Sequence, residues 1–279
     1  TPLNSGYSNL NIGGYYMKEE RSFNWKIGGN VYRHKYNWYG LPSINFDASS
    51  IDAIIEQQTY GYYELNGEIT FEDSYFNTIK TSVNLFDDFY GSKEVGVSLK
   101  PNLKFPLTRI NRNLKDLELK TSIHYLQGEF KQNYSDDSNL NYAFFNFGIH
   151  PVLKLDWKKL NIKLGSKIYL SSDIENSLTD ILAYPDVEIS YPLNSGLINI
   201  YTGANGDLHM NSFQRLSELN PFVSPTLFLT QTNEQYNLFG GINGTLSSNI
   251  SFNLKASYKK DEDHALFVRN NSKSNGEFS

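Results

Sequence analysis

The sequence contains no cysteine, which excludes disulfide bonds and thiolate metal sites. No apolar run approaches the roughly 20 residues that a membrane-spanning helix needs. The net charge of −5 gives no electrostatic reason to expect a nucleic-acid partner. Hydrophobic residues make up only 39% of the chain, a low share for a packed globular core. Together these absences argue against a helical membrane protein, a disulfide-stapled domain and a nucleic-acid-binding protein.

What the chain does have is a two-residue alternation of apolar and polar side chains. In "ISFNLKASYK", Ile250, Phe252 and Leu254 alternate with Ser251 and Asn253. Successive side chains of a strand point to opposite faces, so this stretch is predicted to be a two-faced strand. The same pattern recurs in "LNIGGYY", "WKIGGNV", "YGYYELNGEITF", "IKTSVNL", "VGVSLKPNLKF", "LELKTSIHY", "FFNFGIHPVLKL", "LNIKLGSKIYL", "YPDVEISYPL", "LINIYTGA" and "YNLFGGINGTL". We expect about twelve such strands, with "ALFVR" as a candidate thirteenth.

The links between these stretches alternate in length. Tight links fall at residues 21–24, 73–77, 157–159, 194–196 and 247–249. Between them lie long polar links such as "WYGLPSINFDASSIDAIIE", "QNYSDDSN", "SSDIENSLTD" and "LHMNSFQRLSELNPFVSPTLFLTQTNE". This asymmetry is typical of outer-membrane barrels, which have short periplasmic turns and longer outer loops.

Alternation alone does not decide whether the apolar faces contact lipid or a protein core, because antiparallel sandwiches alternate too. Strands of about 9–11 residues match a tilted membrane crossing. Aromatic residues crowd the predicted strand ends, where interface girdles lie. They include Tyr36, Trp38, Tyr39, Tyr60, Tyr62, Tyr63, Phe86, Phe89, Tyr90 and Trp157. We therefore predict an all-β fold, a transmembrane antiparallel β-barrel built as a meander with about 12–14 strands in this chain.

The polar faces of these strands are predicted to face the lumen. The expected lumen-facing residues are Lys26, Glu64, Glu68, Lys80, Lys100, Lys104, Glu118, Lys120, His124, His150, Lys154, Lys163, Lys167, Lys255 and Lys259. Lysines outnumber acids in this set, so a conducting barrel is expected to prefer anions. Two alternatives stay open: the lysines lie at the rims and select nothing, or an inward-folded acidic loop closes the pore.

No constellation of residues indicates catalysis. His209 precedes Ser212 in "HMNS", but no Asn or Asp partner can be placed for a triad. The pairs Asp87–Asp88 and Asp136–Asp137 are expected in long loops, without the spacing of an EF-hand. We therefore predict that the protein is not an enzyme, and we expect no cofactor and no metal.

Several stretches resemble a family of outer-membrane barrels of the Bacteroidota, of the TonB-dependent-receptor-like type. They are "YSNLNIGGYYMKEERSFNWKIGGNVYRHKYNWYGLP", "YPDVEISYPL", "INIYTGANGDLHMNSFQRLSELNPFVSP" and "YNLFGGINGTLSSNISFNLKASYKKDEDHALFV". The resemblance implies a barrel fold and an outer-membrane location. Because residues 1–9 lead almost directly into the first strand, we expect the resemblance to cover only the barrel part of such receptors, without a plug.

The sequence thus predicts one integral outer-membrane barrel domain over residues 1–279, for passage or recognition of a ligand at the cell surface. The C-terminal "SKSNGEFS" continues no alternating strand and suggests that the sequence stops inside a larger barrel. The expected partners are outer-membrane lipid and other outer-membrane proteins. One alternative is a non-transporting accessory subunit of an assembly or secretion complex. A second is a secreted glycan-binding β-sandwich.

Overall fold

The computed structural model describes residues 6–37, 57–72, 74–131, 140–193, 197–223, 227–247 and 249–267. They contain one long antiparallel sheet and a short helix, α2, at Phe213–Leu219. Within this described part, no helix has the length and apolar character needed to span a bilayer. The strands are β1 (Tyr7–Glu19), β2 (Phe23–Asn37), β3 (Gln57–Phe71), β4 (Phe76–Asp88), β5 (Lys93–Pro106), β6 (Leu114–Phe130), β7 (Leu140–Trp157), β8 (Leu160–Asp173), β9 (Leu178–Leu193), β10 (Ile198–His209), β11 (Thr232–Ser247) and β12 (Ile250–Glu262).

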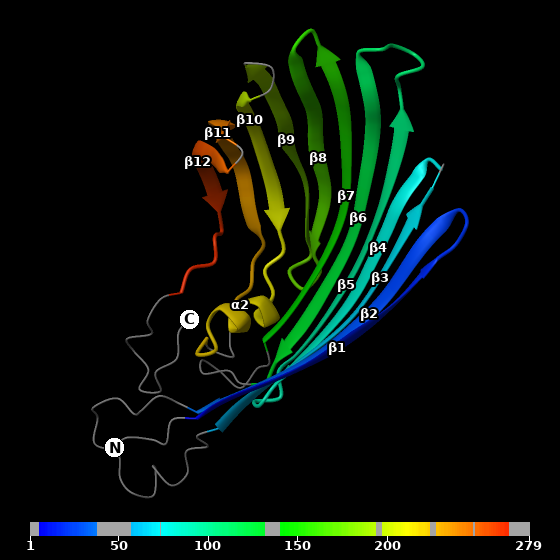
Figure 1. Ribbon diagram of the computed structural model, residues 1–279. Coiled ribbons are helices and arrows are strands. Elements are labelled where there is room, and N and C mark those ends of the chain that lie inside the picture. Colours follow the sequence, from blue (N-terminus) through cyan, green and yellow to red (C-terminus); the bar gives the residue numbers. More distant parts are fainter. Residues whose placement is uncertain are drawn as a thin grey trace, which may run out of the picture.

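The predicted meander is confirmed. Each strand pairs with its neighbour in sequence, in the order β1 to β12. Eleven of the twelve alternating stretches fall inside strands, and the twelfth, "LINIYTGA", begins one residue before β10; most strands extend beyond the stretch that predicted them. The expected thirteenth strand is not formed at residues 265–267, and residues 268–269 lie outside the described part. The sheet is strongly curved, and α2 lies within its concave side (Figure 1).

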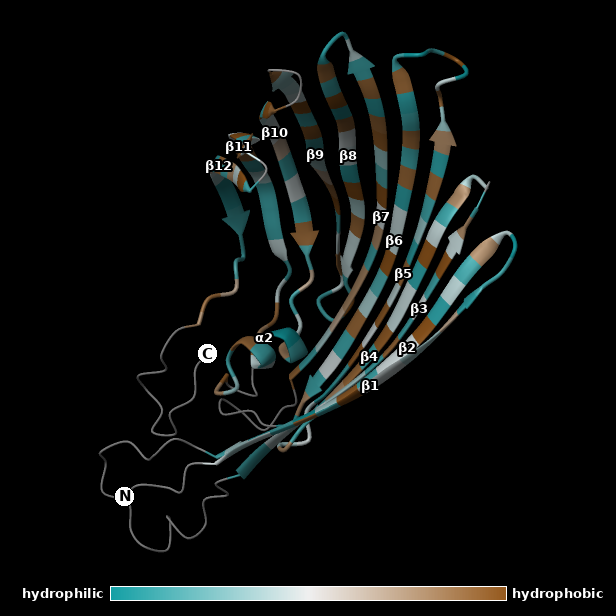
Figure 2. Cartoon of the chain, viewed as in Figure 1, coloured by the Kyte–Doolittle hydropathy of each residue, from teal (hydrophilic) through white to brown (hydrophobic). Residues whose placement is uncertain are grey.

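The two faces of the sheet differ as a barrel wall requires. One register row runs Leu65, Val83, Val97, Tyr125 and Phe145 across five strands. Large apolar side chains on this convex face remain exposed, for example Leu65 at 53%, Leu164 at 45% and Ile200 at 45%. Brown and teal bands alternate along the strands in Figure 2, the pattern that a two-faced sheet gives. Exposed apolar side chains on one whole face are expected where that face contacts lipid.

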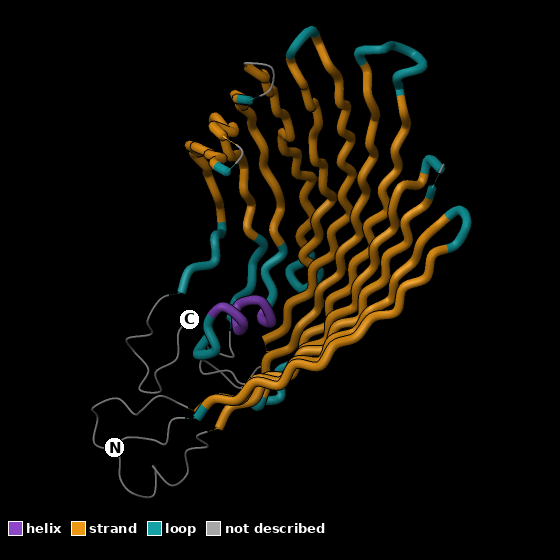
Figure 3. Tube along the Cα trace, viewed as in Figure 1, coloured by secondary structure: helices purple, strands orange, loops and turns teal. Residues whose placement is uncertain are grey.

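The links follow the predicted lengths only in part (Figure 3). In a meander, the links after even-numbered strands share one end of the sheet, here called the loop end. Residues 38–56 and 210–231 connect strands at that end, but the turns at 89–92 and 174–177 are as tight as those at the opposite end. The "SSDIENSLTD" stretch is therefore a tight hairpin, because β8 and β9 continue through most of it. The predicted link at 194–196 lies outside the described residues.

The edges of the sheet carry unpaired backbone. Among the described residues, β1 pairs with β2 alone and β12 with β11 alone. Every residue of β1 is exposed, and so are most of those in β12. The two edge strands lie on opposite sides of the concave space in Figure 1. Open sheet edges do not occur in the hydrocarbon region of a bilayer, because their backbone groups would lack hydrogen bonds.

Candidate functional site

A cluster of buried hydrophobic side chains lies on the concave face at the loop end. There α2 rests on four buried aromatic side chains, here called the aromatic floor: Tyr60, Tyr62, Phe86 and Phe130, each at most 4% exposed. Phe213, the first residue of α2, is itself 1% exposed. Its ring centroid lies 4.8 Å from that of Phe130 and 5.2 Å from that of Phe86, both in edge-on geometry. Such pairs contribute about 0.5–1.5 kcal/mol beyond their buried area.

A carboxylate from the wall caps the helix. Glu94, on β5, accepts hydrogen bonds from the backbone amides of Phe213 at 2.7 Å and Gln214 at 3.3 Å. Ser212 completes the cap by accepting from the Arg215 amide at 3.1 Å. The first amides of a helix have no partner within it and favour negative charge nearby, so these bonds fix where the helix begins. An isolated helix of seven residues would not persist in water, which makes docking the source of its stability.

Tyr142 on β7 also donates a hydrogen bond to Glu94, although β6 lies between β7 and β5. The contact is possible because Gly128 of β6 pairs with both Tyr142 and Glu94 in register. A Cβ atom at Gly128 would collide with the Tyr142 ring. The glycine therefore gives the ring a path across β6 to the carboxylate.

The other end of the segment is tied to β3. The hydroxyl of Tyr62 and that of Ser217 lie 3.0 Å apart and share a hydrogen bond, and Ser217 is fully buried. The Tyr60 hydroxyl donates to the carbonyl oxygen of Pro221 at 2.9 Å. Residues 213–221 are thus held to the wall at both ends, and they occupy part of the concave side.

An open cleft of about 500 Å³ lies beside the docked helix. Strands β1, β2 and β3 form its wall, and the α2 segment forms its other side. The lining residues are Tyr7, Asn11, Asn30, Tyr32, His34, Tyr62, Glu64, Gln214, Glu218 and Pro221. Both sequence-predicted lumen acids of β3 lie on this face, but only Glu64 lines the cleft. We call this space the tyrosine cleft.

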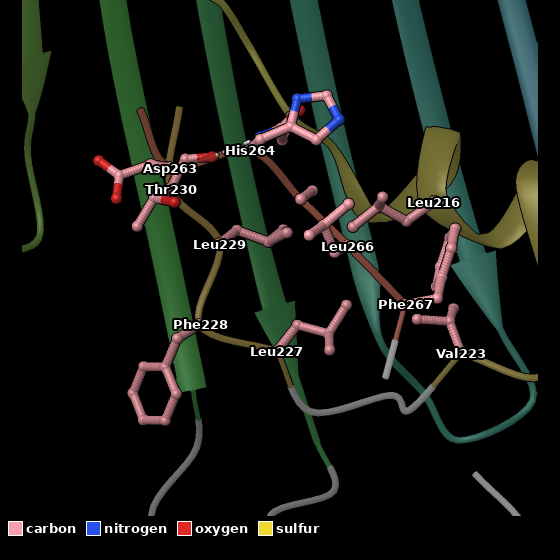
Figure 4. A pocket seen from close by; sticks show the side chains of 12 residues that line it. Leu216, Val223, Leu227, Phe228, Leu229, Thr230, Asp263, His264, Leu266 and Phe267 are labelled. Carbon is pink, nitrogen blue, oxygen red and sulfur yellow. Dashed lines mark hydrogen bonds between the residues drawn. The ribbon is translucent and has the colours of Figure 1, made fainter. Parts of the chain in front are cut away.

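A smaller, mostly apolar cavity of about 250 Å³ lies between residues 227–230 and residues 263–267. Leu227 and Leu229 approach Leu266 from one side, and Leu216 and Val223 approach Phe267 from the other (Figure 4). The side chains around this cavity bring the chain after β12 close to the α2 segment. Its polar lining residues are Asn211, Thr230, Asp263 and His264.

The residues predicted to face the lumen share one face of the sheet. In register, Lys26 pairs with Glu68, which pairs with Lys80, which pairs with Lys100. The pairings continue through the remaining predicted residues on the side that carries α2; these are Glu64, Lys104, Glu118, Lys120, His124, His150, Lys154, Lys163, Lys167, Lys255 and Lys259. Whether this face lines an open pore stays a prediction.

Most of these lysines have acidic partners. Short ion pairs join Lys154 to Glu118 at 2.5 Å, Lys167 to Asp207 at 2.6 Å and Lys163 to Asp186 at 2.7 Å. Asp186 also binds His150 at 2.6 Å. Further pairs join Lys80 to Glu68, Lys104 to Asp116, Lys120 to Glu118 and Lys259 to Asp261. The excess of positive charge expected on this face is therefore largely compensated within the wall.

Three predicted lysines differ from this pattern. The Lys26 ammonium lies 4.4 Å from the centre of the Tyr15 ring, and that of Lys255 lies 4.5 Å from the Phe239 ring. Lys100 lines a separate polar cavity of about 220 Å³ together with His124 and Glu94. Cations over aromatic faces are attracted by the ring quadrupole, so Lys26 and Lys255 are stabilised without a carboxylate.

The prediction of an aromatic girdle at the membrane interface is wrong for four of the residues assigned to it. Tyr36, Tyr60, Tyr62 and Phe86 are buried on the concave face, where they contact α2 or one another. They serve as a platform for a docked segment, which is a different use of aromatic residues at strand ends. Tyr63, Phe89 and Trp157 are exposed, as the prediction requires. Trp38 and Tyr39 lie outside the described residues.

The remaining candidates for chemistry are placed as follows. His209 ends β10 and approaches Glu234 at 3.6 Å, whereas Ser212 is occupied as the helix cap. Asp87 and Asp88 belong to β4, so their expected position in a long loop is wrong. Asp88 instead accepts from the Ser92 amide at 2.7 Å and closes the turn. Asp136 and Asp137 lie outside the described residues.

Comparison with solved structures identifies the fold. The FpvAI–pyocin S2 complex superposes on 94% of this chain with a TM-score of 0.61 and 12% sequence identity. The ferripyoverdine receptor of the outer membrane of Pseudomonas aeruginosa, bound to ferripyoverdine, also matches 94% of the chain, with a TM-score of 0.57 and 13% identity. This chain has the fold of an outer-membrane β-barrel. It spans 44% and 43% of those two chains, less than half of each receptor.

No family model matches the sequence, and no curated protein sequence matches it. The barrel wall is therefore recognised through its shape. The two neighbours are TonB-dependent outer-membrane receptors, in agreement with the resemblance and the location predicted from the sequence. An origin in the Bacteroidota stays a prediction.

Proposed function

We propose that this chain is part of the wall of a cell-surface receptor of the TonB-dependent type, and that its ligand is recognised at the loop end of the concave face. The observation that carries the proposal is the docking of residues 213–221. A simple pore has no need of a helix held on its wall by Glu94, Tyr60 and Tyr62. The docked segment turns a bare strand surface into a cleft that combines aromatic rings with polar groups, and such polar groups orient a ligand.

The proposal also requires that the wall be completed. Among the described residues, the outer edges of β1 and β12 pair with no strand, and in a bilayer they need one because lipid offers no hydrogen bonds. The same edges favour a second candidate function, an accessory barrel that joins other outer-membrane proteins through strand pairing. In that case the tyrosine cleft would bind nothing, and the edges would carry the function.

Surface labelling tests the receptor proposal. Leu219 is 67% exposed at the end of α2, and the chain has no cysteine of its own. A Leu219→Cys variant is expected to react with a membrane-impermeant maleimide on intact cells. A matched Lys159→Cys variant, in the turn at the opposite end, is expected to react only after the outer membrane is permeabilised. Labelling of Lys159→Cys and not of Leu219→Cys on intact cells would place the cleft on the periplasmic side and refute the proposal.

A further inference from the structure

The tyrosine cleft has aromatic walls arranged around an open space. The rings of Tyr7 and His34 lie 4.8 Å apart in edge-on geometry, and those of Tyr32 and Tyr62 lie 5.1 Å apart. Tyr32 is held by donating to the Asn9 side-chain oxygen at 3.1 Å, and Tyr62 is held by Ser217. The rings are therefore fixed before any ligand arrives, and fixed rings bind at a lower entropic cost.

The charge of the cleft has one sign. Its lining includes the carboxylates of Glu64 and Glu218 and neither lysine nor arginine. Within the described part of the chain, neither carboxylate forms an ion pair, although acids elsewhere on the same face do, such as Glu118 and Asp186. Glu218 accepts a hydrogen bond from the neutral side chain of Gln214, at 3.2 Å. The cleft is thus a negative region on a face where most of the predicted lysines are paired with acids.

A buried polar atom also lacks a partner here. His34 is 6% exposed, and its Nε2 atom forms no hydrogen bond with any described residue. Buried ring nitrogens normally find a partner, because leaving one unpaired costs the desolvation of that group. His34 lines the cleft beside the side-chain amides of Asn11 and Asn30, which can accept or donate. The nitrogen is itself enclosed, so the polar groups that the cleft offers a ligand here are the amides of Asn11 and Asn30.

We propose that the tyrosine cleft binds an organic cation, a molecule that carries ammonium or guanidinium groups. Aromatic faces and carboxylates both attract such groups, and the cleft presents both to the same space. Its volume of about 500 Å³ falls within the usual range for small-molecule sites. An anion would meet two carboxylates and no cation. This inference rests on the proposed receptor function, since it names the ligand class of the same site.

The test uses the protein purified from the outer membrane and held in nanodiscs of zwitterionic lipid, so that anionic lipid does not bind the probe. The probe is 1,5-diaminopentane, and its uncharged counterpart 1,5-pentanediol is the control ligand. Calorimetric titration is expected to show binding of the diamine and not of the diol, with an affinity that falls as salt is raised. Glu64→Gln and Glu218→Gln are each expected to weaken binding about fivefold, equivalent to about 1 kcal/mol. Glu175→Gln, which removes the same charge from an exposed turn at the same end, should leave the Kd unchanged.

The outcomes separate the ligand class from the receptor proposal. Equal binding of diamine and diol would overturn the cation assignment and indicate recognition of hydroxyl groups by the tyrosines and amides. Binding of the diamine with an affinity unaffected by Glu64→Gln and Glu218→Gln would place it elsewhere and overturn the inference. No binding of the diamine, in protein whose Leu219→Cys variant is labelled from outside cells, would also overturn it and leave the surface receptor standing.

Discussion

Replacing Phe213 by alanine is expected to release α2 from the wall. The ring is 1% exposed and packs against Phe130 and Phe86, so its loss removes a buried aromatic anchor. Truncation of a buried phenylalanine costs about 3–5 kcal/mol. Residues 213–219 cannot form a stable helix without the wall, so the lost free energy destabilises the docked state of α2. The undocked population is therefore expected to rise by a factor of roughly 10² to 10³ or more.

Thiol labelling measures this release directly. Ser217 is fully buried on the side of α2 that contacts Tyr62 of the wall, so a Ser217→Cys variant should react slowly with maleimide on intact cells. Adding Phe213→Ala should speed the reaction by the same factor of roughly 10² or more, provided that reaction occurs only from the undocked state. Leu219→Ala is the matched control, because that side chain is 67% exposed on the same helix and should change little. Equally slow labelling with and without Phe213→Ala would show that the ring does not anchor the helix.

Three further changes test other parts of the structure. Gly128→Ala should displace the Tyr142 ring and remove its hydrogen bond to Glu94, and we expect this change to speed labelling of Ser217→Cys. Gly14→Ala is the control, because a Cβ there meets nothing within 4 Å, and it should have no effect. Equal labelling rates in the two variants would refute the role of Gly128. Asp207→Asn leaves Lys167 and the Tyr169 hydroxyl without their carboxylate and should lower the free energy of unfolding by about 1–3 kcal/mol in urea titrations. The exposed pair of Glu20 and Lys18 should contribute less than about 1 kcal/mol, so Glu20→Gln costing as much as Asp207→Asn would contradict this ranking. Leu164→Arg should impair assembly into the outer membrane, because a charged side chain facing lipid near the midplane costs about 2–4 kcal/mol, whereas Lys163→Gln should permit assembly. Equally mild effects of both changes on heat-modifiable gel mobility would show that the two faces are misassigned.

The strands were predictable because their pattern is local. Alternation with a period of two marks every strand, and it assigned Lys163 and Leu164 to opposite faces without any knowledge of tertiary contacts. The strand ends were less accurate, and this affected the charge balance. Asp116 and Asp207 lie just outside the alternating stretches that predicted β6 and β10, yet they belong to those strands and pair with Lys104 and Lys167. The excess of lysine predicted for this face arose partly because these two acids were left out of the count.

The site was harder to predict because long-range contacts create it. Part of the cap of α2 comes from Glu94, far away in the sequence, and no local pattern around residue 213 contains that contact. A weak signal was present in Ser212, a residue type favoured at helix N-termini, followed by Phe213 and Leu216 at helical spacing. Tyr62 carried a stronger one: it alternates in phase with Glu64 and therefore belongs to the polar face. Its position at a strand end suggested a lipid girdle, and the phase of the alternation was the better guide.

The central claim is that the convex face contacts lipid and the concave face contacts water or the docked segment. Spin labels placed at the neighbouring positions Lys163 and Leu164, and at Lys167 and Ile168, test it most directly in the bilayer. We predict that relaxation by oxygen, which concentrates in lipid, is strong at residues 164 and 168 and weak at 163 and 167, with the reverse order for a water-soluble nickel chelate. Equal accessibility at neighbouring positions, or strong nickel relaxation at residues 164 and 168, would contradict the assignment of a membrane-embedded wall.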